Sequence, residues 1–94
     1  MLGLAAKAGR LAIGTERVVE KIRGKSKVKL VIVASDVSQN TLKKLKNCCE
    51  YYQTEYIITE YTREDISYAV GKRSLASSVA ILDENFSSAI KKLV

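Results

Sequence analysis

Two spacings of apolar residues alternate along this chain. Three short segments, residues 30–34, 56–59 and 78–82, are almost continuously apolar or β-branched, and this pattern predicts strands. The segments between them repeat apolar residues every three or four positions, which is the spacing of one helix face. Because strands and helices alternate, we predict an α/β fold in which helices cover both faces of a small sheet. Residues 30–34 lack any polar alternation, so we expect this strand to be central and covered from two sides.

Capping residues predict where three of the helices begin and end. Thr15 is expected as the N-cap of a helix that Gly24 ends. Ser38 is expected to begin the next helix. The segment Thr62–Asp65 has the capping-box pattern, and the short helix after it is expected to end at Gly71. The inward faces of these helices are expected to be Val18, Val19 and Ile22, then Leu42, Leu45 and Cys49, then Ile66, Ala69 and Val70.

Both ends of the chain predict further helices. Residues 1–8 contain good helix formers, and residues 11–13 form a short extended piece at most. Asp83 is expected to begin the last helix, with Phe86 on its inward face. A chain of 94 residues is long enough for one domain with one modest core.

Three loops are expected where strands end and helices begin. They are Gly14–Thr15, Ser35–Val37 and Gly71–Ser77. In α/β sheets, binding loops gather at such strand ends, so these segments are the first places to look for a binding site.

The residue types present exclude most catalytic sites. The chain has no His, which is the commonest general base and metal ligand, so Ser–His and Cys–His pairs are excluded. The two cysteines, Cys48 and Cys49, are neighbours; they make no disulfide scaffold and do not complete a zinc site. We interpret Cys49 as a core residue and Cys48 as half-buried. We therefore expect no enzyme, no metal, no cofactor and a reduced, cytoplasmic setting.

No membrane partner is expected either. The longest apolar run, Leu30–Ala34, is far shorter than the ~20 residues that a membrane-spanning helix needs.

The positive charge is concentrated in the first third of the chain. The formal net charge is +6, and residues 1–30 alone carry a net charge of +6. A polyanion such as nucleic acid would be attracted to such a region. A basic surface that only keeps the protein soluble fits the same composition, so charge alone leaves both interpretations open.

The helix start at Gly14–Arg17 is the best single candidate for a binding site. A helix N-terminus offers free backbone N–H groups and a partial positive charge to an anion. Arg17 can present two parallel donors to a guanine edge or to a phosphate. An ordinary capped helix start accounts for the same residues without any ligand, so this alternative also stays open.

Several segments taken together carry a family resemblance. In chain order they are Leu2–Leu11, Gly14–Thr15, Lys21–Gly24, Lys29–Asp36, Asn40–Thr41, Lys43–Lys44, Thr62–Glu64, Ala69–Lys72, Ala80–Asp83 and Phe86. Their order and spacing resemble the kink-turn RNA-binding family named after the large-subunit ribosomal protein seven-Ae, and more closely its small bacterial YlxQ-like branch. The resemblance spans essentially the whole chain.

The resemblance implies a three-layer α/β/α sandwich with a small mixed sheet of about four strands. It also implies a single non-catalytic domain, residues 1–94, that binds structured, kink-turn-like RNA and no DNA, with ribosomal RNA as one candidate. In this family the start of the second helix enters the widened major groove, and the loop before the last strand covers an extruded nucleotide. Carried over, the expected RNA-binding residues are Gly14, Thr15, Glu16, Arg17, Glu20, Lys25, Lys27, Asp36, Val37, Arg73, Ser74, Leu75, Ala76 and Ser77.

Three positions depart from the pattern of the best kink-turn binders. Where those proteins have Asn, Glu and Lys, this chain has Glu16, Arg17 and Glu20. Glu16 and Glu20 would repel phosphate, whereas Arg17 can still donate to guanine. The sequence therefore supports two functions of different classes: an RNA-binding protein, and a protein-interaction module that kept the fold and lost kink-turn recognition.

Overall fold

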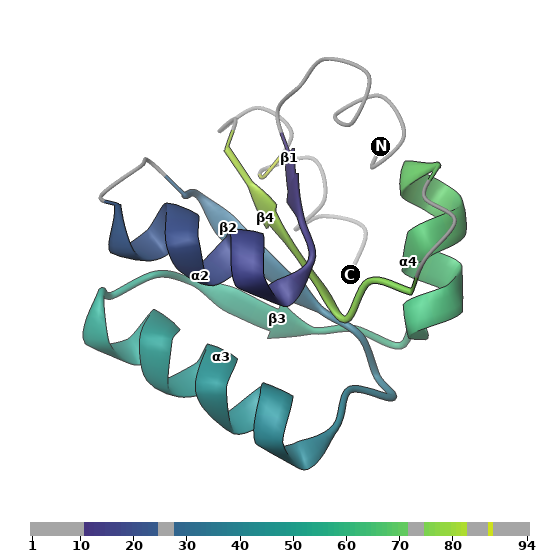
Figure 1. The fold of residues 1–94 in the computed structure, drawn as a ribbon, viewed down its shortest axis with the longest axis horizontal. Coiled ribbons are helices and arrows are strands. Elements are labelled where there is room, and N and C mark those ends of the chain that lie inside the picture. Colours follow the sequence, from purple (N-terminus) through teal and green to yellow (C-terminus); the bar gives the residue numbers. More distant parts are fainter. Residues whose placement is uncertain (1–10, 25–27, 72–74, 83–86, 88–94) are drawn as a thin grey trace.

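The computed structural model describes residues 11–24, 28–71, 75–82 and 87. Within these ranges the chain forms strands β1 (Leu11–Ile13), β2 (Leu30–Val33), β3 (Tyr56–Ile58) and β4 (Ser78–Ile81). The helices are α2 (Thr15–Arg23), α3 (Gln39–Tyr51) and α4 (Arg63–Val70) (Figure 1). The helix expected over residues 1–8 and the cap expected at Asp83 lie outside the described residues.

The strands form one mixed sheet in the order β1–β4–β2–β3. β4 pairs antiparallel with β1 on one side and with β2 on the other, and β2 pairs parallel with β3. The sequence pattern predicts β2, β3 and β4, and the short extended piece expected at residues 11–13 is the edge strand β1. The expected four-strand mixed sheet is confirmed.

Helices cover both faces of this sheet, so the expected three-layer sandwich is confirmed (Figure 1). β2 explains the arrangement, because its alternate residues enter different cores. Val31 and Val33 pack in one cluster with residues of α2 and α3, whereas Leu30 and Ile32 pack in a second cluster with Ile66 of α4. A strand that is buried on both faces reads as a continuous apolar run.

Most of the predicted helix ends are confirmed. The Ser38 hydroxyl accepts a hydrogen bond from the Thr41 N–H at 3.3 Å, and Thr62 and Asp65 form the reciprocal capping box of α4. Gly24 is the C-cap of α2. Gly71 ends α4 in the left-handed conformation, with a φ of 74°, which glycine adopts without steric cost.

Thr15 is not the N-cap of α2, contrary to the sequence prediction. Gly14 takes that position, and within the described ranges no side chain caps the helix. The Thr15 hydroxyl instead lies 3.1 Å from the hydroxyl of Ser78 at the start of β4. The tertiary contact with β4 therefore replaces the local cap.

The inward face of α4 also differs from the prediction. Ala69 is exposed, whereas Ser67 is buried with 4% exposure. Ser67 tolerates burial because its hydroxyl accepts a hydrogen bond from the Ala76 N–H at 2.8 Å. Ile66 and Val70 are buried as predicted, so the departure is limited to Ser67 taking the inward place expected for Ala69.

Candidate functional site

The three loops singled out in the sequence meet at one edge of the sheet. In the strand register, Ile13 at the end of β1 pairs with Val79, and Val33 at the end of β2 pairs with Ser78 at the start of β4. The Gly14 N–H donates to the Ser78 carbonyl at 2.9 Å, and the Ala34 N–H donates to the Ser77 carbonyl at 2.9 Å. We call this edge the loop edge. Helices α2, α3 and α4 each begin just after a strand that ends there.

The start of α2 is open to solvent at the loop edge. Gly14 and Thr15 are half-buried, and Glu16, Arg17 and Glu20 are exposed. Gly14 has a φ of 99° and a ψ of 145°, which turns the chain sharply from β1 into the helix. Among the described residues no side chain caps α2, so its first backbone N–H groups can accept an anion as partner.

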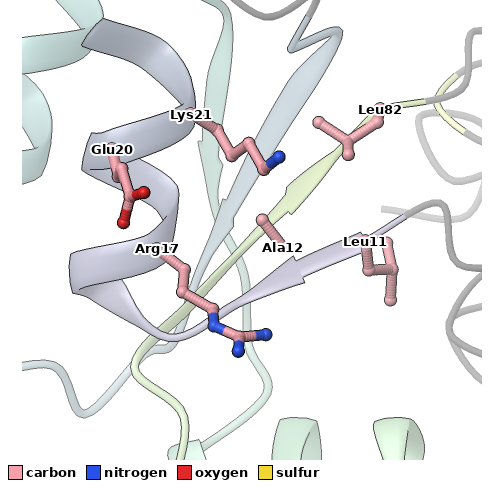
Figure 2. A pocket seen from close by; sticks show the side chains of 6 residues that line it. All are labelled: Leu11, Ala12, Arg17, Glu20, Lys21 and Leu82. Atoms are coloured by element: carbon pink, nitrogen blue, oxygen red, sulfur yellow. The ribbon is translucent and has the colours of Figure 1, made fainter. Parts of the chain in front are cut away.

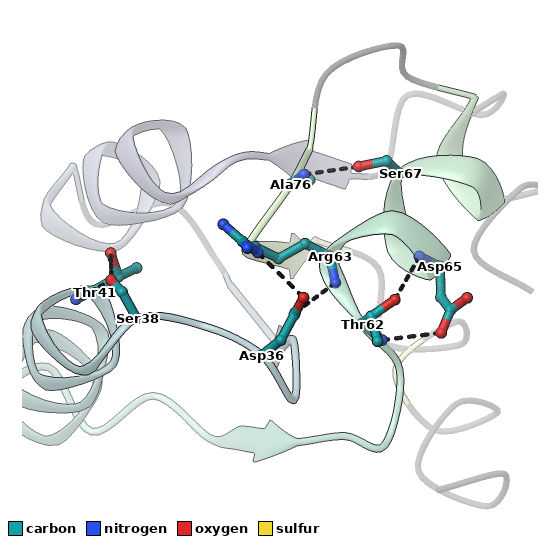
Figure 3. A network of polar contacts seen from close by, with 8 residues as sticks. All are labelled: Asp36, Ser38, Thr41, Thr62, Arg63, Asp65, Ser67 and Ala76. Carbon is teal, nitrogen blue, oxygen red and sulfur yellow. Dashed lines mark hydrogen bonds and ion pairs between the residues drawn. The ribbon is translucent and has the colours of Figure 1, made fainter.

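Asp36 joins the second loop to the start of α4. Its carboxylate accepts a hydrogen bond from the Arg63 backbone N–H at 2.7 Å, and its other oxygen lies 3.4 Å from the Arg63 Nε (Figure 3). The backbone hydrogen bond from Arg63 is the main reason that the pKa of Asp36 is lowered from its usual value. Asp36 is therefore engaged within the protein, and its charge is partly offset by the Arg63 guanidinium.

Two of the expected contact residues are held inside the fold. Ala76 is 2% exposed and packs in the core beneath α4, and Val37 is partly buried against the core beneath α2 and α3. Leu75 is 59% exposed, and Ser77 is half-buried. Among the described residues of the third loop, Leu75 is thus the side chain that reaches solvent most fully. Lys25, Lys27, Arg73 and Ser74 lie outside the described residues.

An open hollow of about 440 Å³ adjoins the exposed face of α2. It is lined by Leu11, Ala12, Arg17, Glu20, Lys21 and Leu82. We call it the α2–β1 hollow. Figure 2 shows Lys21 extending over the sheet towards Ala12 and Leu82, and Arg17 reaching out beside β1. Three apolar side chains and three charged ones therefore share one concave surface.

The sequence analysis missed Arg63 and Lys21 as members of this region. Arg63 lies 27 positions from Asp36, and no local pattern indicates that pairing. Lys21 is exposed on α2, and only the fold places it beside Leu82.

The cysteine pair offers no reactive site. Cys49 is fully buried, and Cys48 is 9% exposed, so Cys48 is more buried than the half-buried position expected for it. Burial, with smaller effects of Cys48 and Glu50, raises the pKa of the Cys49 thiol to about 11. At neutral pH this thiol is protonated and is a poor nucleophile.

The described ranges contain neither a metal-ligand cluster nor a membrane-spanning helix. No group of three or more His, Cys, Asp or Glu residues there could hold a metal ion. Across residues 11–24, 28–71, 75–82 and 87, no helix is long and apolar enough to span a bilayer.

These observations define a small basic α/β/α domain that presents an uncapped helix start and two loops at one edge of its sheet. The chain belongs to the ribosomal protein L7Ae/L30e/S12e/Gadd45 family, whose family model matches residues 1–91. The resemblance inferred from the sequence is thereby confirmed.

Individual relatives place the chain more closely. It is 33% identical over 94 residues to the RNA-binding protein YlxQ of Bacillus subtilis (strain 168), covering 100% of this chain and 91% of that protein. It is 34% identical over 94 residues to the RNA-binding protein YlxQ of Enterococcus faecium, covering 100% of this chain and 87% of the relative. The expected YlxQ-like branch is confirmed.

Solved structures share the fold. A protein from Bacillus halodurans C, described as having unknown function, superposes with a TM-score of 0.87 at 35% identity, covering 98% of this chain and 90% of that chain. The Giardia lamblia 15.5kD RNA binding protein superposes with a TM-score of 0.80 at 15% identity, covering 98% of this chain and 77% of that chain. At that identity, the second match supports the fold alone.

Proposed function

We propose that this protein is a non-catalytic RNA-binding protein that recognises structured, kink-turn-like RNA through the loop edge. The observation that carries the proposal is the exposed, uncapped start of α2, where Arg17 stands free in solvent. Membership of the L7Ae family and relatives named RNA-binding protein support it. Ribosomal RNA is one candidate partner, and a cytoplasmic setting belongs to the same proposal.

Three features of the loop edge suit an anionic, bent RNA. The start of α2 lies there without a side-chain cap from the described residues, and the partial positive charge of such a helix start favours phosphate. Arg17 can donate to guanine O6 and N7 in a widened groove. The exposed side chain of Leu75 can cover an unstacked base, as the loop before the last strand does in the family.

Arg63 adds a cation to this edge that the sequence analysis did not include. Its side chain is 40% exposed, and its buried Nε lies 3.4 Å from the Asp36 carboxylate, without a hydrogen-bond partner among the described residues. Because Nε itself is buried, a contact with phosphate or a base would come from the exposed part of this side chain. The backbone hydrogen bond from Arg63 to Asp36 fixes the second loop, and the ion pair with Asp36 holds the Arg63 side chain beside it.

Glu16 and Glu20 lower the attraction of α2 for phosphate. Both carboxylates are exposed, and they stand where strong kink-turn binders have Asn and Lys. We therefore expect RNA affinity to depend on Arg17 and on the other cations of the first third. If four to six phosphates are neutralised, the salt dependence of binding should have a slope of roughly −3 to −5.

A gel-shift titration with a kink-turn RNA and a matched RNA duplex tests the proposal. Arg17→Ala should weaken kink-turn binding by about 1–3 kcal/mol, because one guanine loses its paired donors. Arg23→Ala is the matched control, since Arg23 is an exposed cation at the far end of the same helix. It should cost less and affect kink-turn and duplex equally.

One result would argue against this function, and another would argue only against the role of Arg17. Equal affinity for kink-turn and duplex at low salt would favour the alternative, a protein-interaction module that has lost RNA recognition. Equal losses in Arg17→Ala and Arg23→Ala would leave RNA binding in place but remove Arg17 from base recognition.

A further inference from the structure

The outer face of α3 carries a line of basic and amide side chains. Five exposed residues recur at positions i, i+3, i+4, i+7 and i+11 of this helix, so they share its solvent side: Asn40, Lys43, Lys44, Asn47 and Tyr51. We call this line the α3 stripe. Among the described residues, the side chains of Lys43 and Lys44 form no hydrogen bond or ion pair. The stripe thus presents two cations and no acid.

The charges of α3 are not arranged for the stability of the helix itself. A helix is stabilised by acids in its first turn and by cations in its last turn, and α3 has neither. Lys43 and Lys44 lie instead in its first half, and no Asp or Glu stands three or four positions from either of them. Helix stability therefore does not explain these lysines, and their placement favours an anion outside the protein.

The α3 stripe starts at the loop edge and leads away from it. β2 ends at that edge with Val33, and α3 follows over Gln39–Tyr51. Helices α2 and α3 pack in the same core on one face of the sheet, and Figure 1 shows them side by side. At 1.5 Å per residue, the stripe is about 16 Å long from Asn40 to Tyr51. An RNA bound at the loop edge can therefore continue along α3.

We propose that the α3 stripe binds the sugar–phosphate backbone of a double-stranded RNA stem that continues from the RNA at the loop edge. The ammonium groups of Lys43 and Lys44 are point charges that suit phosphate. The amide groups of Asn40 and Asn47 can donate to phosphate and accept from ribose 2′-hydroxyls. Such contacts recognise the shape of a stem and not its sequence. The proposal rests on the proposed function for the direction from which the stem arrives.

Tyr51 ends the stripe with a restrained polar group. Its side chain is 80% exposed, and its ring packs edge-on against Tyr52 with the ring centroids 4.9 Å apart. Because this contact limits the motion of the ring, the Tyr51 hydroxyl can donate to a phosphate at a low cost in entropy.

A protein partner fits the α3 stripe less well than an RNA backbone. The centre of a protein interface is depleted in charged residues, and lysine is rare there. The middle of the stripe consists of Lys43, Lys44 and Asn47, and the stripe contains no aliphatic side chain. Charge and composition therefore both favour a polyanion as the occupant.

The experiment varies the length of the RNA stems together with single residues of α3. Gel-shift titrations over a range of salt compare a kink-turn RNA with minimal stems, the same RNA with each stem in turn extended by one helical turn, and a straight duplex of the extended length. The proteins are the parent, Lys44→Gln, Asn47→Asp and Lys46→Gln. Lys46 is the matched control, because it is an exposed lysine of the same helix that lies outside the stripe. Thermal unfolding followed by circular dichroism checks that all of these proteins fold equally well.

In the parent, extension of one of the stems should raise the affinity by about tenfold, because the stripe then neutralises phosphates that the minimal stem lacks. Lys44→Gln should reduce this gain by about threefold to tenfold near 0.1 M salt and lower the salt slope by about 1. Asn47→Asp should also reduce the gain, since it places a carboxylate within the stripe. Lys46→Gln should keep the gain, and every variant should bind the minimal RNA within about twofold of the parent.

The proposal is overturned if neither extension raises the affinity, if the gain survives in Lys44→Gln, or if Lys44→Gln and Lys46→Gln lose it equally. The first of these results would favour a protein partner or solvent on this face.

The straight duplex separates failure of this proposal from failure of the proposed function. Equal affinity for kink-turn and duplex argues against kink-turn recognition at the loop edge. Weaker duplex binding by Lys44→Gln, but not by Lys46→Gln, supports the α3 stripe whether or not the kink-turn is recognised.

Discussion

Replacing Gly14 by alanine tests whether backbone conformation alone holds the start of α2 in place. Gly14 has a φ of 99° and a ψ of 145°, a region that is occupied almost only by glycine. A Cβ atom at this position would meet no heavy atom within 4 Å. The substitution therefore adds backbone strain without steric overpacking, and it leaves the surrounding cores untouched.

The expected loss of stability is about 1–3 kcal/mol, which is the usual cost of holding an L-residue in such a conformation. This is a large part of the roughly 5–15 kcal/mol that stabilises a typical domain. For a chain of this size, each kcal/mol lowers the melting temperature by about 4–8 °C. If the chain relieves the strain by shifting the turn, kink-turn affinity should fall as well, because Arg17 moves with it.

Urea unfolding measures the change, with Lys21→Ala as the control. Lys21 is exposed in the middle of α2 and has ordinary helical geometry, so its substitution should alter stability by less than about 0.5 kcal/mol. A Gly14→Ala protein as stable as this control would refute the argument, since the turn would then tolerate a side chain.

Three further predictions address the rest of the molecule. Ser67→Ala should cost about 1–3 kcal/mol in urea unfolding, because the buried Ala76 N–H loses its acceptor; a neutral result would mean that this N–H finds another partner. The pKa of Asp36 is lowered on folding, so its stabilising hydrogen bond from Arg63 is complete above pH 3.8 and is lost as the pH falls through the lowered pKa. The NMR chemical shift of the Arg63 amide should follow this titration. Asp36→Asn should abolish the pH dependence of that shift. The Cys49 thiol should react with a thiol reagent at pH 8 only after denaturation, and rapid labelling of the folded protein would contradict its burial.

Short-range sequence signals predicted much of the fold. The capping box at Thr62–Asp65, the Ser38 cap and the buried strand at Leu30–Val33 each depend on residues a few positions apart. The two errors in the helices have a common cause. The hydroxyl groups of Thr15 and Ser67 form hydrogen bonds with Ser78 of β4 and with Ala76 in the segment before it. These tertiary partners determine the helix cap and the buried face, which local capping and periodicity did not predict.

The candidate site, too, was predicted in part from local sequence and in part depends on the tertiary fold. The sequence alone pointed to the start of α2, because a glycine before a helix with an exposed arginine is a local pattern. It also placed three loops at strand ends, but it could not determine the strand order that brings them to one edge.

The chain by itself determined the element types, the basic first third and the family, since these follow from residue type and spacing. Tertiary structure decided that β4 inserts between β1 and β2, and that Asp36 pairs with Arg63. It also decided that Lys21 and Leu82 share a hollow. The physical reason is that these contacts join residues far apart in the chain. Their formation depends on packing both faces of the sheet at once, and no local pattern encodes it.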